Sequence, residues 1–155
     1  MRSAVFLLAL FALGCGKEIG DKCIISTDCS PNGDRQCDQS SKEGYCTIQG
    51  CDVGTCPEEA VCVRFFTGGF ANRPCDPATE DRGTDACALD ELCSLNGLCV
   101  ARSSEIRFCM KKCESIDDCR DGYECRDLSL MISHGGEPVT DDDSFPSFCA
   151  AESVF

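Results

Sequence analysis

Cysteine is the feature that most constrains this chain, because it accounts for 17 of the 155 residues. Cysteines this dense are typical of an exported chain held together by disulfides, since cytosolic thiols are kept reduced. The chain has no Trp and only two Tyr, so its apolar core is expected to be thin. One disulfide contributes about 2–4 kcal/mol of stability, largely by restricting the unfolded chain. We therefore expect disulfides, rather than an extensive apolar interior, to hold the fold.

The odd number of cysteines leaves one thiol without a partner in the chain. Near the start, Arg2 precedes the apolar run "AVFLLALFAL" and the small residues Ala12 and Gly14. A basic residue, a short apolar segment and small residues before a cleavage point are typical of an export signal. Ten apolar residues are too few for a membrane-spanning helix, which needs about 20. We expect residues 1–14 to be removed, which makes Cys15 the first mature residue.

The residues at this cleavage point, Ala12-Leu13-Gly14-Cys15, resemble the lipobox of bacterial lipoproteins. The commonest form of the motif has Leu where Ala12 stands. The resemblance implies that a diacylglyceryl group is attached to the sulfur of Cys15 and that its new amino terminus is acylated. An ordinary secretory signal, cleaved at the same bond, is the alternative. The lipid interpretation accounts for the motif and for the odd thiol, and it predicts membrane attachment through Cys15.

The other sixteen cysteines fall into two series of eight with similar spacing, which predicts an internal duplication. The gaps are 5, 7, 8, 4, 4, 5 and 12 residues in the first series and 5, 5, 9, 3, 5, 5 and 23 in the second. An even number in each copy suggests that each closes four bridges of its own, although bridges between the copies are possible. The predicted disulfide cysteines are Cys23, Cys29, Cys37, Cys46, Cys51, Cys56, Cys62, Cys75, Cys87, Cys93, Cys99, Cys109, Cys113, Cys119, Cys125 and Cys149.

The duplication predicts a small disulfide-rich fold, mostly irregular with short β-hairpins, in two tandem similar lobes. The alternation of Val and Phe with other residues predicts a strand over residues 60–66, and residues 123–133 have a similar pattern. Residues 85–93 predict a helical turn. The expected organisation is a signal peptide (1–14), a lipid-anchored tether (15–22), a first module (23–75), a linker (76–84) and a second module (85–155).

Four motifs together resemble cysteine-rich lipoproteins of myxobacteria and similar diderm bacteria. They are the lipobox, "GDKC" at residues 20–23, the "GYC…C…CP…C" run within residues 44–62, and "DDCRDGYEC" at residues 117–125. Residues 113–125 are also similar to a pattern in knottin-like, EGF-like and dickkopf-like extracellular modules. The lipoprotein resemblance implies a lipid-anchored protein of the bacterial outer membrane or cell surface, and Gly16, in place of an Asp that signals inner-membrane retention, favours the outer membrane. Secretion is the alternative.

Charge and motif content exclude several classes of function. Loss of Arg2 with the signal changes the net charge from −13 to −14, and such a surface repels nucleic acid. The absence of Cys-x2-Cys argues against zinc, haem and thioredoxin-type sites, so we expect no metal and no cofactor. Aspartates 141–143 lack the spacing of an EF-hand, which favours a solvated acidic loop. A catalytic triad would need His134, the one histidine, and because no hydrolase motif accompanies it we expect no enzyme.

Binding is the remaining class of function. Phe65, Phe66 and Phe70 surround two glycines in "RFFTGGF", where they either form a contact loop or a small local core. We expect a non-catalytic, lipid-anchored extracytoplasmic protein with a role in surface interaction, adhesion or envelope structure, and a protein or glycan partner that the sequence does not identify. The alternative is a secreted protease inhibitor or toxin-like binding protein, which would present residues 63–74 or 126–148.

Overall fold

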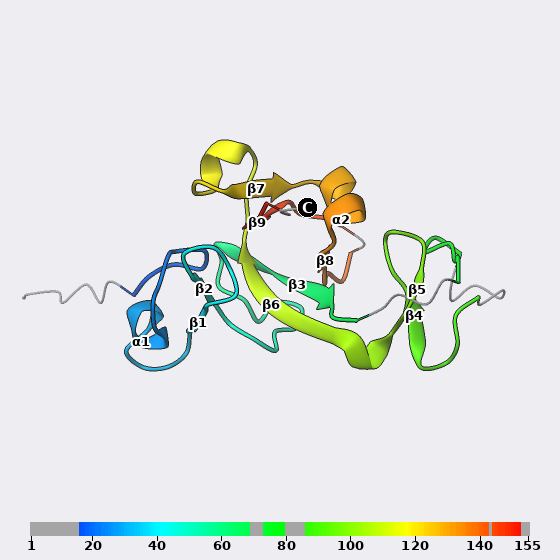
Figure 1. Ribbon diagram of the computed structural model, residues 1–155, viewed down its shortest axis with the longest axis horizontal. Helices are drawn as coiled ribbons and strands as arrows, with labels where there is room; N and C mark the ends of the chain where they lie inside the picture. The colour runs from blue at the N-terminus through cyan, green and yellow to red at the C-terminus, as the bar shows by residue number, and fades with distance from the viewer. Residues whose placement is uncertain (1–15, 69–72, 80–85, 143, 153–155) are drawn as a thin grey trace, which may run out of the picture.

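The computed structural model describes residues 16–68, 73–79, 86–142 and 144–152, and Figure 1 shows the course of the chain. Short antiparallel strands dominate these ranges, and none of their helices is long and apolar enough to cross a membrane. The elements are α1 (Ser26–Cys29), β1 (Gln36–Asp38), β2 (Tyr45–Thr47), β3 (Ala60–Phe66), β4 (Glu91–Cys93), β5 (Cys99–Ala101), η1 (Arg102–Ser104), β6 (Glu105–Lys111), η2 (Ile116–Asp118), β7 (Tyr123–Arg126), α2 (Leu128–His134), β8 (Glu137–Pro138) and β9 (Phe148–Ala151).

The strands β3 and β6 form the longest strand pair and run through the middle of the molecule (Figure 1). Their antiparallel register runs from Ala60 opposite Lys111 to Phe66 opposite Glu105, so the strand predicted over residues 60–66 is confirmed. On the other edge of β3, the short strand β8 pairs with Val63 and Arg64. The sheet order is therefore β6-β3-β8, and its central strand carries the fully buried Val63.

Eight disulfides join all the cysteines from Cys23 onward, which confirms the predicted disulfide-rich fold class. They pair Cys23 with Cys37, Cys29 with Cys46, Cys51 with Cys62, Cys56 with Cys109, Cys75 with Cys93, Cys87 with Cys99, Cys113 with Cys125, and Cys119 with Cys149. The bridges define four units of four cysteines, and within each unit the first cysteine is bonded to the third and the second to the fourth. We name them the first unit (Cys23, Cys29, Cys37, Cys46), the second unit (Cys51, Cys56, Cys62, Cys109), the third unit (Cys75, Cys87, Cys93, Cys99) and the fourth unit (Cys113, Cys119, Cys125, Cys149).

The four units share one strand geometry. In each of them the third and fourth cysteines lie directly opposite one another on paired antiparallel strands. The opposed pairs are Cys37 and Cys46 on β1 and β2, Cys62 and Cys109 on β3 and β6, Cys93 and Cys99 on β4 and β5, and Cys125 and Cys149 on β7 and β9. The same arrangement of four cysteines on a strand pair thus occurs four times among the described residues.

The third unit is inserted between the third and fourth cysteines of the second unit, at the tip of the β3–β6 hairpin. The expectation that each eight-cysteine copy closes its own bridges is wrong, because two bridges join cysteines from the two copies. These are Cys56–Cys109 and Cys75–Cys93. The predicted arrangement in two lobes is not confirmed, and Figure 1 instead shows the third unit, with β4 and β5, at the opposite end of the long axis from α1.

No disulfide joins one unit to another among the described residues, so non-covalent packing holds the units together. The shared core contains the buried side chains of Ile19, Tyr45, Val63, Met131 and Phe148. These residues come from the segment before the first unit and from the first, second and fourth units. Ile19 is fully buried, so the folded body begins inside the segment that the sequence predicted as a tether.

Two predicted elements differ from the observed ones. Only β7 is extended within residues 123–133, because the chain turns into the helix α2 at Leu128. Asp127 starts this helix, since its carboxylate Oδ1 accepts the backbone N–H of Leu130 at 3.0 Å, as an N-cap residue does. The helical turn expected over residues 85–93 is wrong for the described part, because residues 86–90 form a bend and a turn and residues 91–93 form β4. Residue 85 lies outside the described ranges.

Candidate binding cleft beside the third unit

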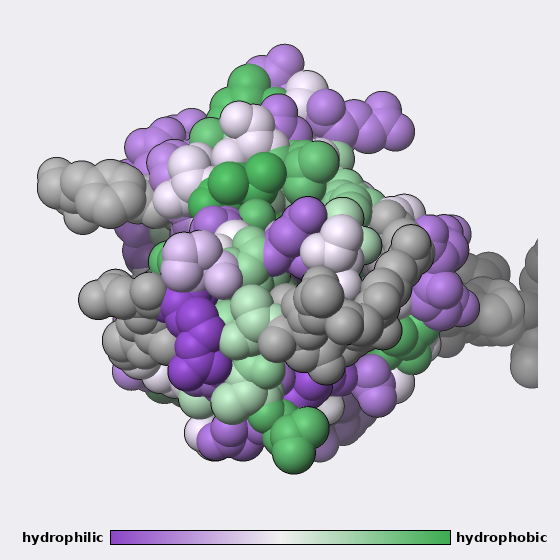
Figure 2. Space-filling view, turned by 90° about the vertical axis from the view of Figure 1, so that its right-hand side faces the viewer, coloured by the Kyte–Doolittle hydropathy of each residue, from purple (hydrophilic) through white to green (hydrophobic). Residues whose placement is uncertain are grey.

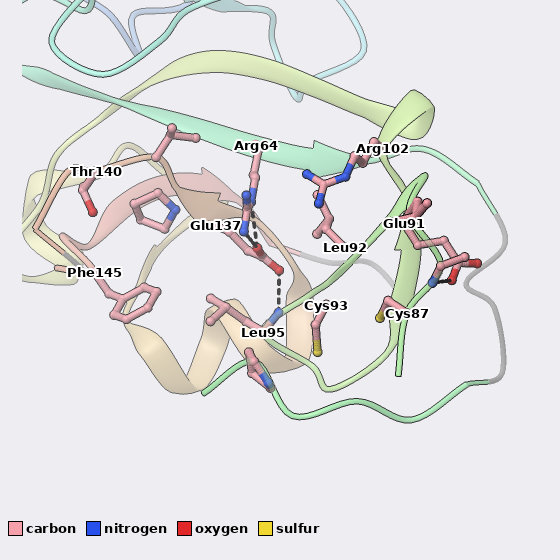
Figure 3. A pocket seen from close by; sticks show the side chains of 15 residues that line it. Arg64, Cys87, Glu91, Leu92, Cys93, Leu95, Arg102, Glu137, Thr140 and Phe145 are labelled. Carbon is pink, nitrogen blue, oxygen red and sulfur yellow. Dashed lines mark hydrogen bonds and ion pairs between the residues drawn. The ribbon is translucent and has the colours of Figure 1, made fainter. Parts of the chain in front are cut away.

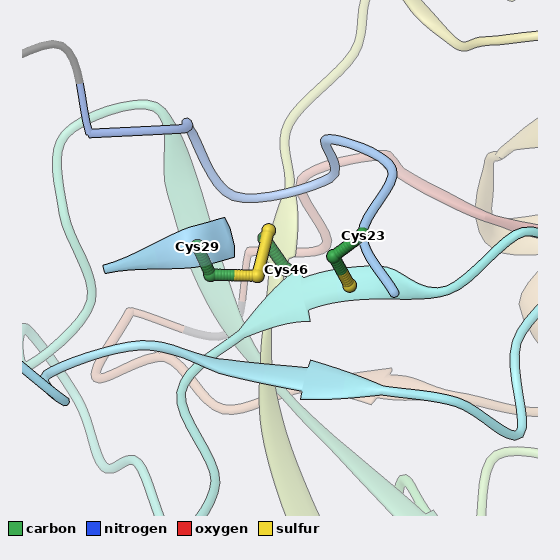
Figure 4. Close-up of side chains that lie close together, drawn as sticks. All are labelled: Cys23, Cys29 and Cys46. Carbon is green, nitrogen blue, oxygen red and sulfur yellow. A yellow bond between two sulfur atoms is a disulfide. The ribbon is translucent and has the colours of Figure 1, made fainter. Parts of the chain in front are cut away.

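Cys15, the predicted lipidation site, lies outside the described residues. The structure instead describes the sulfurs of the sixteen other cysteines, many of which lie in tight clusters. Figure 4 shows one of them, in which Cys23, Cys29 and Cys46 lie close together in the first unit. Their sulfurs are oxidised, because Cys29 is bonded to Cys46 and Cys23 to Cys37. A disulfide sulfur is not the thiolate that zinc requires, so the closeness of these sulfurs follows from the packing of two bridges.

The predicted aromatic contact residues lie mainly on β3. The ring of Phe65 packs at 6.4 Å from that of Phe108 and at 6.3 Å from that of the buried Phe148. The guanidinium of Arg64 covers Phe66, with 5.8 Å between its Cζ and the ring centroid. Phe70 lies outside the described residues. Phe65 is thus part of the edge of the core, which corresponds to the local-core alternative.

The single histidine forms part of a charged network at the end of α2. His134 Nδ1 lies 2.7 Å from Glu124 Oε1, and the same carboxylate oxygen accepts a hydrogen bond from Arg126 Nε at 2.7 Å. Arg126 is buried and also donates to the carbonyl oxygens of Gly135 and Ala151. The neighbouring hydroxyl, Ser133 Oγ, donates to the backbone of its own helix. This network fastens α2 to β7 and β9.

A cleft of about 480 Å³ opens between the third unit and the β3–β8 strand pair, and Figure 3 shows its lining. Its volume lies within the range of small-molecule and cofactor sites, about 300–1,000 Å³. One wall comes from the third unit and the other from β8 and the residues after it. The apolar lining residues include Leu89, Leu92 and Leu95 from the third unit, and Pro138, Val139 and Phe145 from the opposite wall.

Glu137 lies at the junction of the two walls and is only 4% exposed. Its Oε2 accepts hydrogen bonds from Arg64 Nε at 2.9 Å and forms an ion pair with Arg64 Nη2 at 2.8 Å. Its Oε1 accepts the backbone N–H of Leu95 at 2.6 Å. One carboxylate therefore joins β8 to β3 and to the third unit, as the dashed lines in Figure 3 indicate. Because it has two partners, this buried charge satisfies the requirement that buried carboxylates be paired.

Among the described residues, the charged side chains of the cleft differ in whether they have an ion-pair partner. Glu91 is bound by Arg73 at 2.8 Å, and Glu137 is bound by Arg64. Arg102 also lines the cleft, and its side chain has no ion pair within the part of the chain that the structure describes. Leu89, which lines the same cleft, is 99% exposed. The arrangement can hold a ligand that combines an apolar group with a negative charge.

The end of the molecule that carries the third unit is less polar than the acidic composition implies. Figure 2 views this end directly, and green and pale green side chains form an interrupted band from the top to the bottom of the face, with hydrophilic residues on both sides. Leu89 of the third unit and Leu128, Ile132 and Phe145 of the fourth unit are among the exposed large apolar residues of the chain. Exposed apolar side chains that gather on one face indicate an interaction surface.

Sequence reasoning missed Glu137, Arg64, Leu95 and Arg102. Glu137 follows two glycines in a segment that has no periodicity, so nothing in its neighbourhood distinguishes it from a surface acid. Arg64 stands in a predicted strand, where an outward charged residue is ordinary. Their pairing depends on the fold of residues 126–148, since that segment brings β8 beside β3.

We expect Glu137→Ala to lower the free energy of unfolding by about 2–3 kcal/mol. The change leaves Arg64 and the Leu95 amide without their acceptor, and the effect falls below that of a fully buried pair because Arg64 is partly exposed. Urea denaturation measures the loss, and hydrogen exchange should accelerate at the Leu95 amide. Arg73→Gln, which breaks the exposed Arg73–Glu91 pair, is the control and should change stability by about 0–1 kcal/mol. Equal effects of the two variants would contradict the assigned role of Glu137.

Comparisons with known proteins found no relative of this chain. No protein family matches it, and no curated protein and no solved structure is significantly similar. Its eight disulfides fit an extracellular or surface protein. Any finer statement of function depends on the geometry of the molecule.

Proposed function

We propose that this chain is a non-catalytic, lipid-anchored extracytoplasmic protein with a role in surface interaction, adhesion or envelope structure. The observation that carries the proposal is the use of all sixteen cysteines from Cys23 onward in disulfides. Cys15 then has no cysteine left in the chain to pair with, and it stands in the lipobox-like sequence Ala12-Leu13-Gly14-Cys15. Acylation of its sulfur and amino group explains this arrangement, and several acyl chains make a stable anchor where one is marginal.

The arrangement of the units supports an interaction role at the end away from the anchor. The first unit, which follows Cys15 in the chain, and the third unit lie at opposite ends of the long axis (Figure 1). The cleft beside the third unit and the exposed Leu89 therefore lie far from the proposed membrane attachment. A rigid, bridge-held surface of this kind loses little conformational entropy on binding.

The protease-inhibitor alternative has less support, because its two candidate loops are largely built into the fold. Within residues 63–74, the first four belong to β3 and its Phe65 packs on the core. Residues 126–148 include α2 and β8 and contribute the buried side chains of Met131 and Phe148. In their described residues, neither segment forms a protruding, preorganised loop of the kind that inhibits a protease.

Metabolic labelling tests the anchor. The full chain is expressed in a diderm bacterium with an alkyne fatty acid, and the purified protein is assayed for label. We expect label on the wild type and none on Cys15→Ser, because no other cysteine is free to accept a lipid. Gly16→Asp serves as the matched control, since it should keep the label while shifting the protein toward the inner membrane. An unlabelled wild-type protein, or label that persists in Cys15→Ser, would overturn the proposed anchor.

A further inference from the structure

Two isoleucines at the start of the first unit are strongly exposed. Ile24 is 80% exposed and Ile25 is 53% exposed, directly after Cys23. Isolated apolar residues on a surface are common, but two adjacent large ones in a chain with so few large apolar residues form a concentrated apolar tip. The first unit has its own small core of bridges, and neither isoleucine is part of it.

The apolar tip is held rigidly outward. Asp28 Oδ2 accepts the backbone N–H of Ile24 at 2.8 Å and that of Ile25 at 3.1 Å. These two amides lower the pKa of the Asp28 carboxyl below its ordinary value, so the acceptor is ionised at neutral pH. Gln39 Nε2 also donates to the carbonyl of Ile24 at 2.7 Å. The exposure of the isoleucines is therefore imposed by specific hydrogen bonds rather than by an absence of structure.

The chain between the proposed anchor and the folded body is very short. Ile19 is fully buried, and the N–H of Gly20 bonds to the carbonyl of Cys46 on β2 at 2.9 Å. Only residues 16–18 separate Cys15 from this fixed point. An extended chain covers at most about 3.6 Å per residue, so the Cα atom of Cys15 lies within about 14 Å of that of Ile19. A lipid on Cys15 must bring the first unit against the bilayer.

The charges around the apolar tip permit that approach. Lys17 and Lys22 lie beside Ile24 along one shallow hollow, and Lys17 Nζ donates to the carbonyl of Lys22 at 2.7 Å. Asp28 and Glu43 line the same hollow. Two lysines and two carboxylates make this region nearly neutral in a chain of net charge −13. A nearly neutral tip avoids the repulsion that the rest of the surface would meet at anionic headgroups.

We propose that Ile24 and Ile25 form a second membrane contact, which inserts into the interface of the bilayer and fixes the orientation of the protein on it. The proposal rests on the lipid anchor proposed above, because two isoleucines alone are too few for stable binding. With the tip in the interface and Lys17 and Lys22 beside the headgroups, the first unit lies on the membrane. The third unit and its cleft then point away from it.

A single introduced tryptophan tests the contact, since the natural chain has none. Ile24→Trp carries the probe on the tip, and Leu89→Trp carries it on the third unit as the matched control, because Leu89 is 99% exposed at the opposite end. Residues 15–155 are coupled through the thiol of Cys15 to a maleimide phospholipid and incorporated into phosphatidylcholine vesicles. This coupling supplies the anchor whether or not the natural protein is acylated.

We expect the emission of Ile24→Trp to move to shorter wavelength on vesicles and to lose a large fraction of its intensity when the lipids are brominated. The emission of Leu89→Trp should remain that of a solvated indole. Ile25→Trp is a second probe in case the first variant misfolds, and adding Ile24→Ser to it should reduce its quenching. Equal emission from the tip probes and the Leu89→Trp control would overturn the second contact. Failure of the lipid anchor is detected separately, as an absence of fatty-acid label on the wild type.

Discussion

The double variant Cys56→Ser/Cys109→Ser is expected to lose about 4 kcal/mol of unfolding free energy, the largest effect of any single bridge in the chain-entropy treatment. Cys56 and Cys109 are separated by 53 residues, more than any other bonded pair. Their bridge closes the β3–β6 hairpin around the inserted third unit, so its loss frees the longest loop in the unfolded chain. Urea denaturation of the oxidised protein measures the change.

The control for this prediction is Cys87→Ser/Cys99→Ser, which opens a bridge of sequence separation 12 within the third unit. The shorter loop predicts a smaller loss, about 3 kcal/mol. Hydrogen exchange should then increase mainly in the third unit, whereas loss of Cys56–Cys109 should increase it along β3 and β6. A control variant less stable than Cys56→Ser/Cys109→Ser would contradict the view that the third unit is a self-contained insertion.

Tyr45→Ala is expected to destabilise the protein by about 3–5 kcal/mol, the range for truncating a buried aromatic residue. Tyr45 is only 2% exposed and stacks on Tyr123 of the fourth unit, with 5.5 Å between ring centroids. Its hydroxyl donates to the carbonyl of Cys149 at 3.1 Å and accepts the N–H of Lys111 at 2.9 Å. Since no described bridge crosses between units, this side chain is a principal link between the first unit and the rest.

Tyr45→Phe separates the contribution of the ring from that of the hydroxyl. It keeps the stacking on Tyr123 but leaves the Lys111 amide and the Cys149 carbonyl without their partner, which costs about 1–3 kcal/mol. Both variants are compared with the wild type by urea denaturation, and hydrogen exchange in the first unit should rise most in Tyr45→Ala. Equal stability of Tyr45→Ala and Tyr45→Phe would contradict the role of the ring at this junction.

Arg120 strengthens the same junction. Its guanidinium lies over the ring of Tyr123, with 4.1 Å from Cζ to the centroid, and donates to the carbonyl oxygen of Lys42 at 2.9 Å. Its buried Nε and Nη1 atoms have no hydrogen-bond partner among the described residues. The face of an aromatic ring attracts a guanidinium. The contacts with the rings of Tyr45 and Tyr123 therefore stabilise the buried charge of Arg120 where hydrogen bonds are missing.

The sequence predicted the chemistry of the fold better than its connectivity. Cysteine density indicated a bridge-held protein, and the alternation in "AVCVRFF" located β3. The pairing could not be read from spacing, because Cys109 follows Cys62 only after the complete third unit. Two series of eight with similar gaps concealed a four-cysteine strand pair that occurs four times, once interrupted by an insertion.

The candidate cleft could not be predicted from the sequence, for a related physical reason. It depends on Glu137 being brought to Arg64 and to the Leu95 amide by the path of residues 126–148. That path includes α2, which begins at its N-cap residue Asp127. The local pattern did not predict this helix, because the apolar residues after Asp127 also suit a strand. Local propensity is ambiguous for such short apolar runs, and tertiary contacts decide them.

Non-reducing mass spectrometry of the native protein tests the central claim most directly. The intact mass should equal that of residues 15–155 less the sixteen hydrogens lost in eight bridges, plus the acyl groups on Cys15. Proteolysis without reduction should yield linked fragments that join Cys56 to Cys109 and Cys75 to Cys93. An unmodified thiol at Cys15 would contradict the proposed anchor, and bridges that connect the first unit to the fourth would contradict the four-unit architecture. A bridge that includes Cys15 would contradict both.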